Sequence, residues 1–253
     1  MIGGVVMSNV VALITGGSRG IGKAIAIEFA NAGVNLVINY HRHEALANRL
    51  KEKIQTEYGV DVLCVQADVS REEDVEDMVN QAVDYYGKID ILINNAGVSK
   101  DSLLLDKSVS NFKRVIDVNL IGTYLCSKYI GKVMLNRGGG KIINIASTNA
   151  IDTYYPESCD YDASKAGVIS LTHNLAREFA PHIIVNCVCP GWVKTDMNKE
   201  LSIEQIQSEE EKILLHRFAE PDEVAKVVIF LASSKASYVN DSIIRVDGGK
   251  FNG

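Results

Sequence analysis

The chain has 253 residues, of which 47% are apolar and 23% are charged. This composition is ordinary for a globular protein and excludes wholesale disorder. The formal net charge of −6 excludes a broad nucleic-acid surface, because binding a phosphate backbone requires a basic face.

The N-terminal stretch and the cysteines bear on the cellular compartment and on membrane and metal binding. No apolar run reaches the roughly 20 residues that a membrane helix needs, and no basic region precedes an apolar one as in a signal peptide. The five cysteines include no C-x-x-C pair, which argues against a disulfide framework or a structural metal site. We therefore expect a cytoplasmic protein with no membrane, nucleic-acid or metal partner.

Short β-branched runs alternate with longer segments of helical period along the whole chain. The predicted strands are Val10–Ile14, Val34–Asn39, Asp61–Gln66, Ile89–Ile93, Lys141–Ala146, Ile183–Val188 and Ser242–Val246. The predicted helices are Ile21–Ala32, Glu44–Tyr58, Glu72–Tyr86, Phe112–Leu135, Tyr161–Ala180 and Pro221–Ala232. Most strand runs are solidly apolar, which is typical of strands buried on both faces. The pattern predicts one α/β domain over residues 1–253, with a doubly wound, seven-stranded parallel sheet of Rossmann type covered by helices on both faces.

One long stretch, residues 191–221, breaks this alternation. It follows a predicted strand and contains an amphipathic segment, Ile203–Leu215. Ligands of doubly wound sheets bind outside the carboxyl ends of the strands. We therefore predict a substrate lid over residues 191–221; the alternative is a packed pair of helices with no mobility.

A glycine-rich turn follows the first predicted strand and runs directly into a helix. Glycines let the backbone approach a pyrophosphate, and the helix N-terminus offers free N–H groups to the anion. The spacing is G-x-x-x-G-x-G, not the G-x-G-x-x-G of the standard dinucleotide fingerprint, and a tight connection alone could also explain the glycines. The residues expected to contact a dinucleotide here are Gly16, Ser18, Arg19, Gly20, Ile21 and Gly22.

The end of the second strand bears on the choice of cofactor. NAD-binding proteins place an acid near this point for the ribose 2′-OH, but this chain has Asn39-Tyr40-His41-Arg42. The guanidinium groups of Arg19 and Arg42 would suit a 2′-phosphate. The sequence thus favours NADP(H) over NAD(H); the alternative is that both arginines only face solvent.

Polar residues also follow the third and fourth strands, at the edge where a dinucleotide would run. Asp68 could accept a hydrogen bond from the adenine amino group, with Val69 beside it, and Asn95, Ala96 and Gly97 could line the adenosine ribose. Each taken singly could equally be a turn residue, because Asn, Asp and Gly dominate turns.

A Y-x-x-x-K pattern at Tyr161 and Lys165 places a phenol and an ammonium on one helix face. The pattern is common by chance, and Tyr124 with Lys128 matches it too. The first match is favoured because Ser147 lies just past the preceding predicted strand.

Together with Asn119 in DVNL and Pro190–Thr195 (PGWVKT), these motifs resemble the short-chain dehydrogenase/reductase family. Within the family, DSLLL, VIDVNL and the terminal VDGG most resemble the 3-oxoacyl-(acyl carrier protein) reductases. The resemblance implies NADPH-dependent reduction of a 3-oxoacyl thioester in fatty acid biosynthesis, with acyl carrier protein as a partner and a homotetrameric assembly.

The resemblance also implies a role for each catalytic residue. Tyr161 would donate the proton, Lys165 would lower its pKa and hold the nicotinamide ribose, and Ser147 would orient the carbonyl. Asn119 would order the helix backbone and a water relay. The carboxamide end of the cofactor would be seated by Pro190, Gly191, Val193 and Thr195.

Two departures from the reductase pattern keep other functions open. Tyr154-Tyr155-Pro156-Glu157 stands where small residues are usual, and Pro181-His182 stands where many acyl reductases have a basic residue and a glycine. This leaves Arg137 and Lys141 as basic candidates for carrier-protein docking. The alternatives are an NADP-dependent polyol, sugar or other alcohol dehydrogenase and a non-catalytic nucleotide-binding subunit.

Overall fold

The strands are short and apolar, and the structure assembles them into one parallel sheet. This computed structural model describes residues 7, 9–199 and 201–249, so both predicted domain limits, residues 1 and 253, lie outside the described residues. The strands are β1 Val11–Ile14, β2 Asn35–Tyr40, β3 Val62–Gln66, β4 Ile91–Asn94, β5 Gly140–Ile145, β6 Ile183–Pro190 and β7 Ile243–Val246. Each lies within a few residues of its predicted range, and the predicted doubly wound fold is confirmed.

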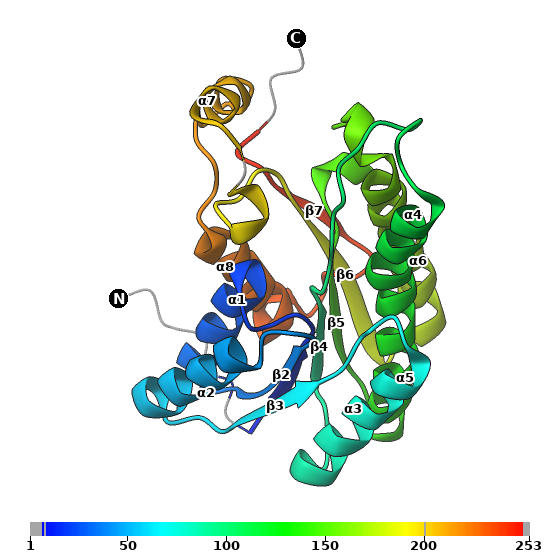
Figure 1. The fold of residues 1–253 in the computed structure, drawn as a ribbon. Coiled ribbons are helices and arrows are strands. Elements are labelled where there is room, and N and C mark those ends of the chain that lie inside the picture. The colour runs from blue at the N-terminus through cyan, green and yellow to red at the C-terminus, as the bar shows by residue number, and fades with distance from the viewer. Residues whose placement is uncertain (1–6, 8, 200, 250–253) are drawn as a thin grey trace.

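The strand order is β3-β2-β1-β4-β5-β6-β7, and every pairing is parallel. The chain therefore winds outward in one direction from β1 and in the other from β4. The carboxyl ends of these two strands form the switch point, which is where open α/β sheets bind ligands. Figure 1 shows the sheet running between its two helical layers.

Helices cover both faces of the sheet, as the apolar strands require. The helices are α1 Gly20–Asn31, α2 Glu44–Tyr58, α3 Glu72–Tyr86, α4 Val109–Ile116, α5 Gly122–Asn136, α6 Cys159–Phe179, α7 Ile203–Glu211 and α8 Pro221–Ala232. One apolar core joins α1, α2 and α8 to the sheet, and a second joins α3, α5 and α6 to the opposite face. Within the described part of the chain, no helix has the length and apolar character needed to cross a membrane.

The predicted helix Phe112–Leu135 is wrong as a single element. The structure has α4, then a π-helical turn at Asp117–Ile121, then α5. Asn119 lies in this π turn, and its side chain hydrogen-bonds with Val98 and Ser164, which lie outside the helix. Such turns occur often at functional sites.

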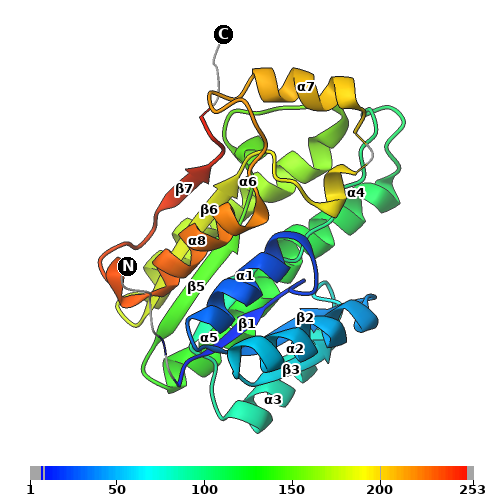
Figure 2. The same cartoon turned by 90° about the vertical axis from the view of Figure 1, so that its left-hand side faces the viewer.

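Two smaller corrections concern helix ends. Tyr161 does not open its helix, because α6 begins two residues earlier, at Cys159. The amphipathic segment predicted to reach Leu215 forms a helix only to Glu211. Beyond Glu211, the backbone N–H groups of Leu214 and Leu215 donate to the carbonyls of Gly249 and Gly248. These two leucines therefore pair with the segment after β7 instead of continuing the helix. Figure 2 shows α7 lying beyond the carboxyl ends of the strands.

Candidate active site

The glycine turn after β1 is held in a shape that only glycine accommodates well. Gly16 and Gly20 have φ of +61° and +54°, in the left-handed region. A Cβ on Gly22 would lie 2.5 Å from the carbonyl oxygen of Gly16 and from Asn95 Nδ2. Arg19 precedes α1 without a side-chain cap, so the first N–H groups of α1 remain available to an anion. This geometry fits a pyrophosphate.

The segment after β4 is fastened to this turn by side chains. Asn95 Nδ2 donates to the carbonyls of Thr15 and Gly16 at 2.9 and 3.2 Å. Thr15 Oγ1 accepts from the backbone N–H groups of Asn95 and Ala96, each at 3.0 Å. Asn95 therefore shapes the turn, and Thr15 is a positioning residue that the sequence reasoning missed. Its place between a buried strand and a double glycine was the available signal.

The end of β2 supports the same turn. Asn39 is buried, and its Oδ1 accepts from the Gly16 N–H at 3.1 Å while its Nδ2 donates to the Ala67 carbonyl at 3.1 Å. Tyr40 is also buried, and desolvation raises the pKa of its phenol. Arg19 and Arg42 are both exposed. The two predicted phosphate-binding cations are thus free to reach solvent on this side.

Asp68 lies at the same edge, but its carboxylate is already engaged. Although burial raises its pKa, hydrogen bonds from Ser70 and Arg114 lower the net value. Ser70 Oγ donates to Oδ1 at 2.6 Å, and Arg114 Nη1 lies 3.0 Å from Oδ2. Val69 is buried, and a Cβ on Gly122 at the start of α5 would lie 2.7 Å from its Cγ2. An adenine amino group would therefore share Asp68 with these donors.

The turn after β6 meets the glycine turn from the other side. A Cβ on Gly20 would lie 3.6 Å from Thr195 Cγ2, so the predicted pyrophosphate and carboxamide segments are adjacent. Gly191 is pressed against Asp247, where a Cβ would come within 2.7 Å of the Asp247 Cβ. Pro190 ends β6, and the buried Val193 forms a parallel bridge with Ala219.

Lys165 reaches from α6 to the end of β5. Its side chain is buried, with 4% of the residue exposed, and Nζ donates to the Ile145 carbonyl at 2.7 Å. Desolvation lowers the pKa of this ammonium to about 8, an effect that Cys187 and Cys189 partly oppose. Nζ lies 5.7 Å from the centre of the Tyr161 ring. The lysine is thus a buried cation beside the phenol rather than a surface charge.

Tyr161 lies beside this lysine and hydrogen-bonds with Ser147. Burial raises the pKa of the phenol to about 12, and a hydrogen bond with Ser147 opposes that rise. Ser147 is itself buried, just past β5, and its Oγ accepts from the Asn149 N–H at 3.2 Å. The two hydroxyl groups are therefore close enough to act on one oxygen atom.

Asn119 is completely buried and acts as a connector. Its Oδ1 accepts from the Val98 N–H at 2.8 Å, and its Nδ2 donates to the Val98 carbonyl and to Ser164 Oγ, both at 3.0 Å. Ser164 Oγ in turn lies 2.6 Å from the Tyr161 carbonyl. A Cβ on Gly97 would lie 3.5 Å from Asn119 Oδ1 and 3.6 Å from Lys165 Nζ, so two of the four predicted catalytic residues meet where Gly97 leaves space.

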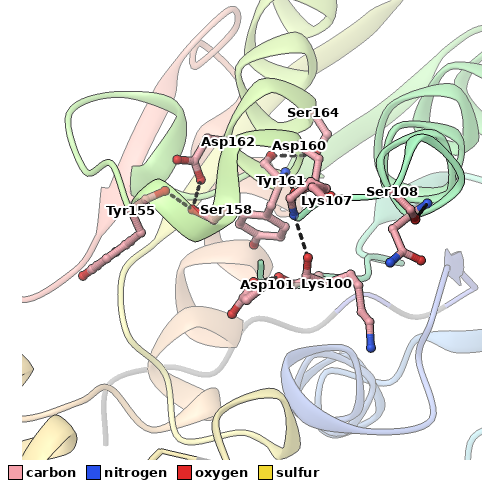
Figure 3. A network of polar contacts seen from close by, with 12 residues as sticks. Lys100, Asp101, Lys107, Ser108, Tyr155, Ser158, Asp160, Tyr161, Asp162 and Ser164 are labelled. Atoms are coloured by element: carbon pink, nitrogen blue, oxygen red, sulfur yellow. Dashed lines mark hydrogen bonds and ion pairs between the residues drawn. The ribbon is translucent and has the colours of Figure 1, made fainter. Parts of the chain in front are cut away.

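A buried ion pair beside Tyr161 was not predicted. Lys107 Nζ lies 2.7 Å from Asp160 Oδ1, and the two side chains are 2% and 0% exposed. The same Oδ1 accepts from the Tyr161 N–H at 2.9 Å, and Lys107 also donates to the Lys100 carbonyl at 2.6 Å (Figure 3). The pair thus ties the segment after β4 to the start of α6. The sequence carries no local signal for it, since the partners are 53 residues apart.

A glycine-lined anion site and a buried lysine beside a tyrosine and a serine together define a nicotinamide-dependent oxidoreductase. Comparisons agree: residues 16–250 match a family model described as enoyl-(acyl carrier protein) reductase. The chain belongs to the short-chain dehydrogenase/reductase family.

Relatives with assigned names are similar over nearly their whole length. The chain is 40% identical over 245 residues to a 3-oxoacyl-[acyl-carrier-protein] reductase FabG of Staphylococcus epidermidis, covering 96% of this chain and 99% of the relative. It is 39% identical over 241 residues to a 3-oxoacyl-[acyl-carrier-protein] reductase of Synechocystis, covering 94% and 96%.

Solved structures show the same architecture. A short-chain type dehydrogenase/reductase from Mycobacterium marinum has a TM-score of 0.93 and 34% identity, covering 99% of this chain and 98% of that one. A short chain dehydrogenase from Burkholderia cenocepacia, solved in complex with NADP, has a TM-score of 0.91 and 30% identity, covering 96% and 98%.

Proposed function

We propose that the chain uses NADPH to reduce the ketone of a 3-oxoacyl thioester, on acyl carrier protein or coenzyme A, to the 3-hydroxyacyl thioester. The observation that carries the proposal is the position of Tyr161, whose hydroxyl bonds with Ser147 and whose ring lies beside the buried ammonium of Lys165. The names of the relatives support the thioester as the substrate class.

In this reaction the bound cofactor supplies a hydride to the carbonyl carbon. Ser147 Oγ donates a hydrogen bond to the carbonyl oxygen and orients it. Tyr161 transfers its phenolic proton to the same oxygen as negative charge develops there, which completes the secondary alcohol. The Lys165 ammonium, 5.7 Å from the centre of the Tyr161 ring, stabilises the resulting phenolate because an opposite charge nearby favours the ionised form. Asn119 acts as a positioning residue, because its polar atoms hold Val98 and Ser164 in place.

The choice of NADP(H) over NAD(H) is also part of the proposal. It is supported by two exposed arginines, Arg19 and Arg42, on the side of the turn where Asn39 replaces an acid. We expect Arg19→Ala and Arg42→Ala each to weaken NADPH binding about tenfold, the loss of one charge-assisted hydrogen bond, with NADH binding unchanged. Arg49→Ala, an exposed arginine on α2, is the matched control. Tighter binding of NADH than of NADPH by the unaltered protein would refute this preference.

A substrate panel tests the reaction itself. Acetoacetyl-CoA with NADPH should be turned over faster than crotonyl-CoA, which offers a C=C bond, and faster than polyols with NADP⁺. Absence of ketone reduction together with polyol oxidation would replace the thioester proposal with the alcohol dehydrogenase alternative. NADPH binding without turnover of any of the substrates would favour the non-catalytic alternative.

The remaining features of the proposal concern the surroundings of the site. Residues 191–221 form a lid over the substrate, and the protein works in the cytoplasm as a homotetramer. Exposed apolar side chains of Val109 and Phe230, on α4 and α8, support an assembly, and sedimentation measures it. Lys141 does not remain a candidate for carrier-protein docking, because its ammonium donates to the carbonyls of Leu231 and Ser233.

A further inference from the structure

The two ends of the segment 191–221 are pinned together at its base. Val193 bridges Ala219, and the backbone of Ala219 also pairs with Trp192 and Lys194. The ring of Trp192 stacks on the buried Phe218, with centroids 5.3 Å apart and planes 9° apart. Backbone hydrogen bonds and ring stacking thus hold the two ends of the segment together below α7.

The helix α7 itself has little apolar attachment. None of its residues is buried, and Ile203 at its start is 71% exposed. Its own N-terminus is capped by Ser202 and Gln205, a contact within the segment. Glu209 is the side chain of α7 that reaches across to another part of the molecule.

Glu209 meets Tyr155 and Trp192 in one hydrogen-bonded cluster. Its Oε2 accepts from Tyr155 Oη at 2.7 Å and from Trp192 Nε1 at 3.0 Å, and Trp192 Nε1 lies 3.2 Å from Tyr155 Oη. The Tyr155 and Trp192 rings also make an edge contact at 5.9 Å. The Glu209 side chain is only 14% exposed, so water competes poorly for these bonds. The three residues thus join the base, α7 and the loop of residues 148–160.

That loop leads directly to the reacting groups. Ser158 Oγ lies 3.1 Å from the Tyr155 carbonyl and 2.8 Å from Asp162 Oδ1 (Figure 3). The same Asp162 oxygen accepts from Asn149 Nδ2 at 2.7 Å, and the Asn149 N–H donates to Ser147 Oγ. Hydrogen bonds, together with the residues Tyr155 and Asn149 themselves, therefore connect α7 to Ser147, whose hydroxyl is proposed to orient the substrate carbonyl.

We propose that Tyr155, Trp192 and Glu209 form a latch that closes α7 onto this loop and thereby limits the size of the group beside the reacting carbonyl. A ketone carries two substituents, and one of them lies on the Ser147 side. A short substituent leaves the two aromatic side chains and the carboxylate in contact, whereas a long one must break the Tyr155–Glu209 bond. The latch thus makes the protein selective for short 3-oxoacyl groups; this inference rests on the proposed function for the identity of the substrate.

Trp192 is the single tryptophan of the chain, so its fluorescence reports the latch without any substrate. Tyr155→Phe and Glu209→Ala remove one partner each. Tyr154→Phe and Glu211→Ala are the matched controls, because Tyr154 and Glu211 are exposed neighbours outside the latch. We expect the emission of both latch variants to shift to longer wavelength as water reaches the indole, with both controls like the unaltered protein. Tyr155→Phe keeps the aromatic ring and removes only the hydroxyl, so it still tests the latch if Glu209→Ala does not fold.

The second measurement is a ratio of specificity constants, kcat/KM for 3-oxodecanoyl-CoA over kcat/KM for acetoacetyl-CoA. We expect this ratio to rise about tenfold in the latch variants, while kcat with acetoacetyl-CoA stays near that of the unaltered protein. An unchanged emission spectrum or an unchanged ratio would overturn the latch. If neither thioester is reduced, the proposed function fails. The tryptophan emission then still tests the contact between Tyr155, Trp192 and Glu209. A small and a large ketone replace the two thioesters in the ratio of specificity constants.

Discussion

Two segments of this chain share the same Y-x-x-x-K spacing but differ in the burial and the hydrogen-bond partners of the tyrosine and the lysine. On α6, Lys165 is buried and bonds to the end of β5, with Tyr161 beside it. On α5, Tyr124 is 45% exposed, and Lys128 points to solvent, where its ammonium bonds to Glu72 at 2.7 Å. Spacing alone puts two side chains on one helix face; burial at the carboxyl edge of the sheet makes the first pair chemically useful.

The neighbouring ion pairs repeat the contrast. Lys107 and Asp160, next to Tyr161, have almost no exposed surface, whereas the Lys128 and Glu72 side chains are 46% and 52% exposed. A buried charge that loses its partner is stranded in a medium of low dielectric, while an exposed one is solvated by water. The same kind of contact therefore carries very different energies in the two regions.

The largest effect on kcat should come from removing the phenolic hydroxyl of Tyr161, and removing that of Tyr124 is the matched control. Tyr161→Phe should lower kcat about 10²- to 10⁴-fold, because it removes the proton donor and leaves the packing unchanged. Tyr124→Phe should stay within about twofold of the unaltered protein, as expected for an exposed substitution. Steady-state kinetics with acetoacetyl-CoA measures both, and NADPH titration should show binding retained. Comparable losses in the two variants would break the comparison.

Stability should respond most to the buried ion pair. Asp160→Asn leaves Lys107 charged and unpaired in the interior, so the free energy of unfolding should fall by about 3–5 kcal/mol. The double variant Lys107→Met/Asp160→Asn removes the stranded charge and should regain most of that loss. Urea unfolding measures all three proteins. A double variant no more stable than Asp160→Asn would show that the cost lies in packing and not in charge.

Between pH 7 and pH 10, the contribution of Lys165 to stability should change with pH and that of Lys128 should not. Folded Lys165 loses its proton near pH 8, while the unfolded chain keeps it to about 10.5, so the unfolded state binds more protons between these values. The stability of the unaltered protein relative to Lys165→Met should therefore rise by about 3 kcal/mol from pH 7 to pH 10. The pKa of Lys128 is raised from 10.5 by its hydrogen bond with Glu72, so its contribution is lost only above that value and should not change from pH 7 to pH 10. Urea unfolding of Lys165→Met and Lys128→Met at the two pH values measures this; a flat difference for Lys165 would contradict it.

The strands and most helices were predictable because their signals are local. Apolar runs such as Val34–Asn39 can be buried on both faces only inside a parallel sheet, and the glycines after α2 and α3 end those helices with φ of +67° and +74°. The π turn at Asp117–Ile121 was not predictable, because the hydrogen bonds that accompany it join Asn119 to Val98 and Ser164, which are distant in sequence.

The site was predictable as a set of motifs but not as a set of contacts. Ser147, Tyr161 and Lys165 stand out by residue type and order. The Lys107–Asp160 and Tyr155–Glu209 contacts join polar residues 53 and 54 positions apart, and each residue taken alone reads as a solvated surface group. Only the folded chain shows that these partners meet, because burial of a polar residue depends on tertiary packing and not on its sequence neighbours.

The smallest effect should follow from Glu72→Gln on α3, which is the exposed counterpart of Asp160→Asn. Glu72 Oε1 accepts from Lys128 at 2.7 Å and from Tyr129 Oη at 2.9 Å, and these bonds lower the pKa of the carboxyl. Once the charge is removed, water solvates the Lys128 ammonium, so neither the melting temperature nor kcat should change measurably. Thermal unfolding at low and high salt measures the effect. A loss of stability as large as that of Asp160→Asn would contradict the comparison, because the exposure of an ion pair would then not decide what it contributes.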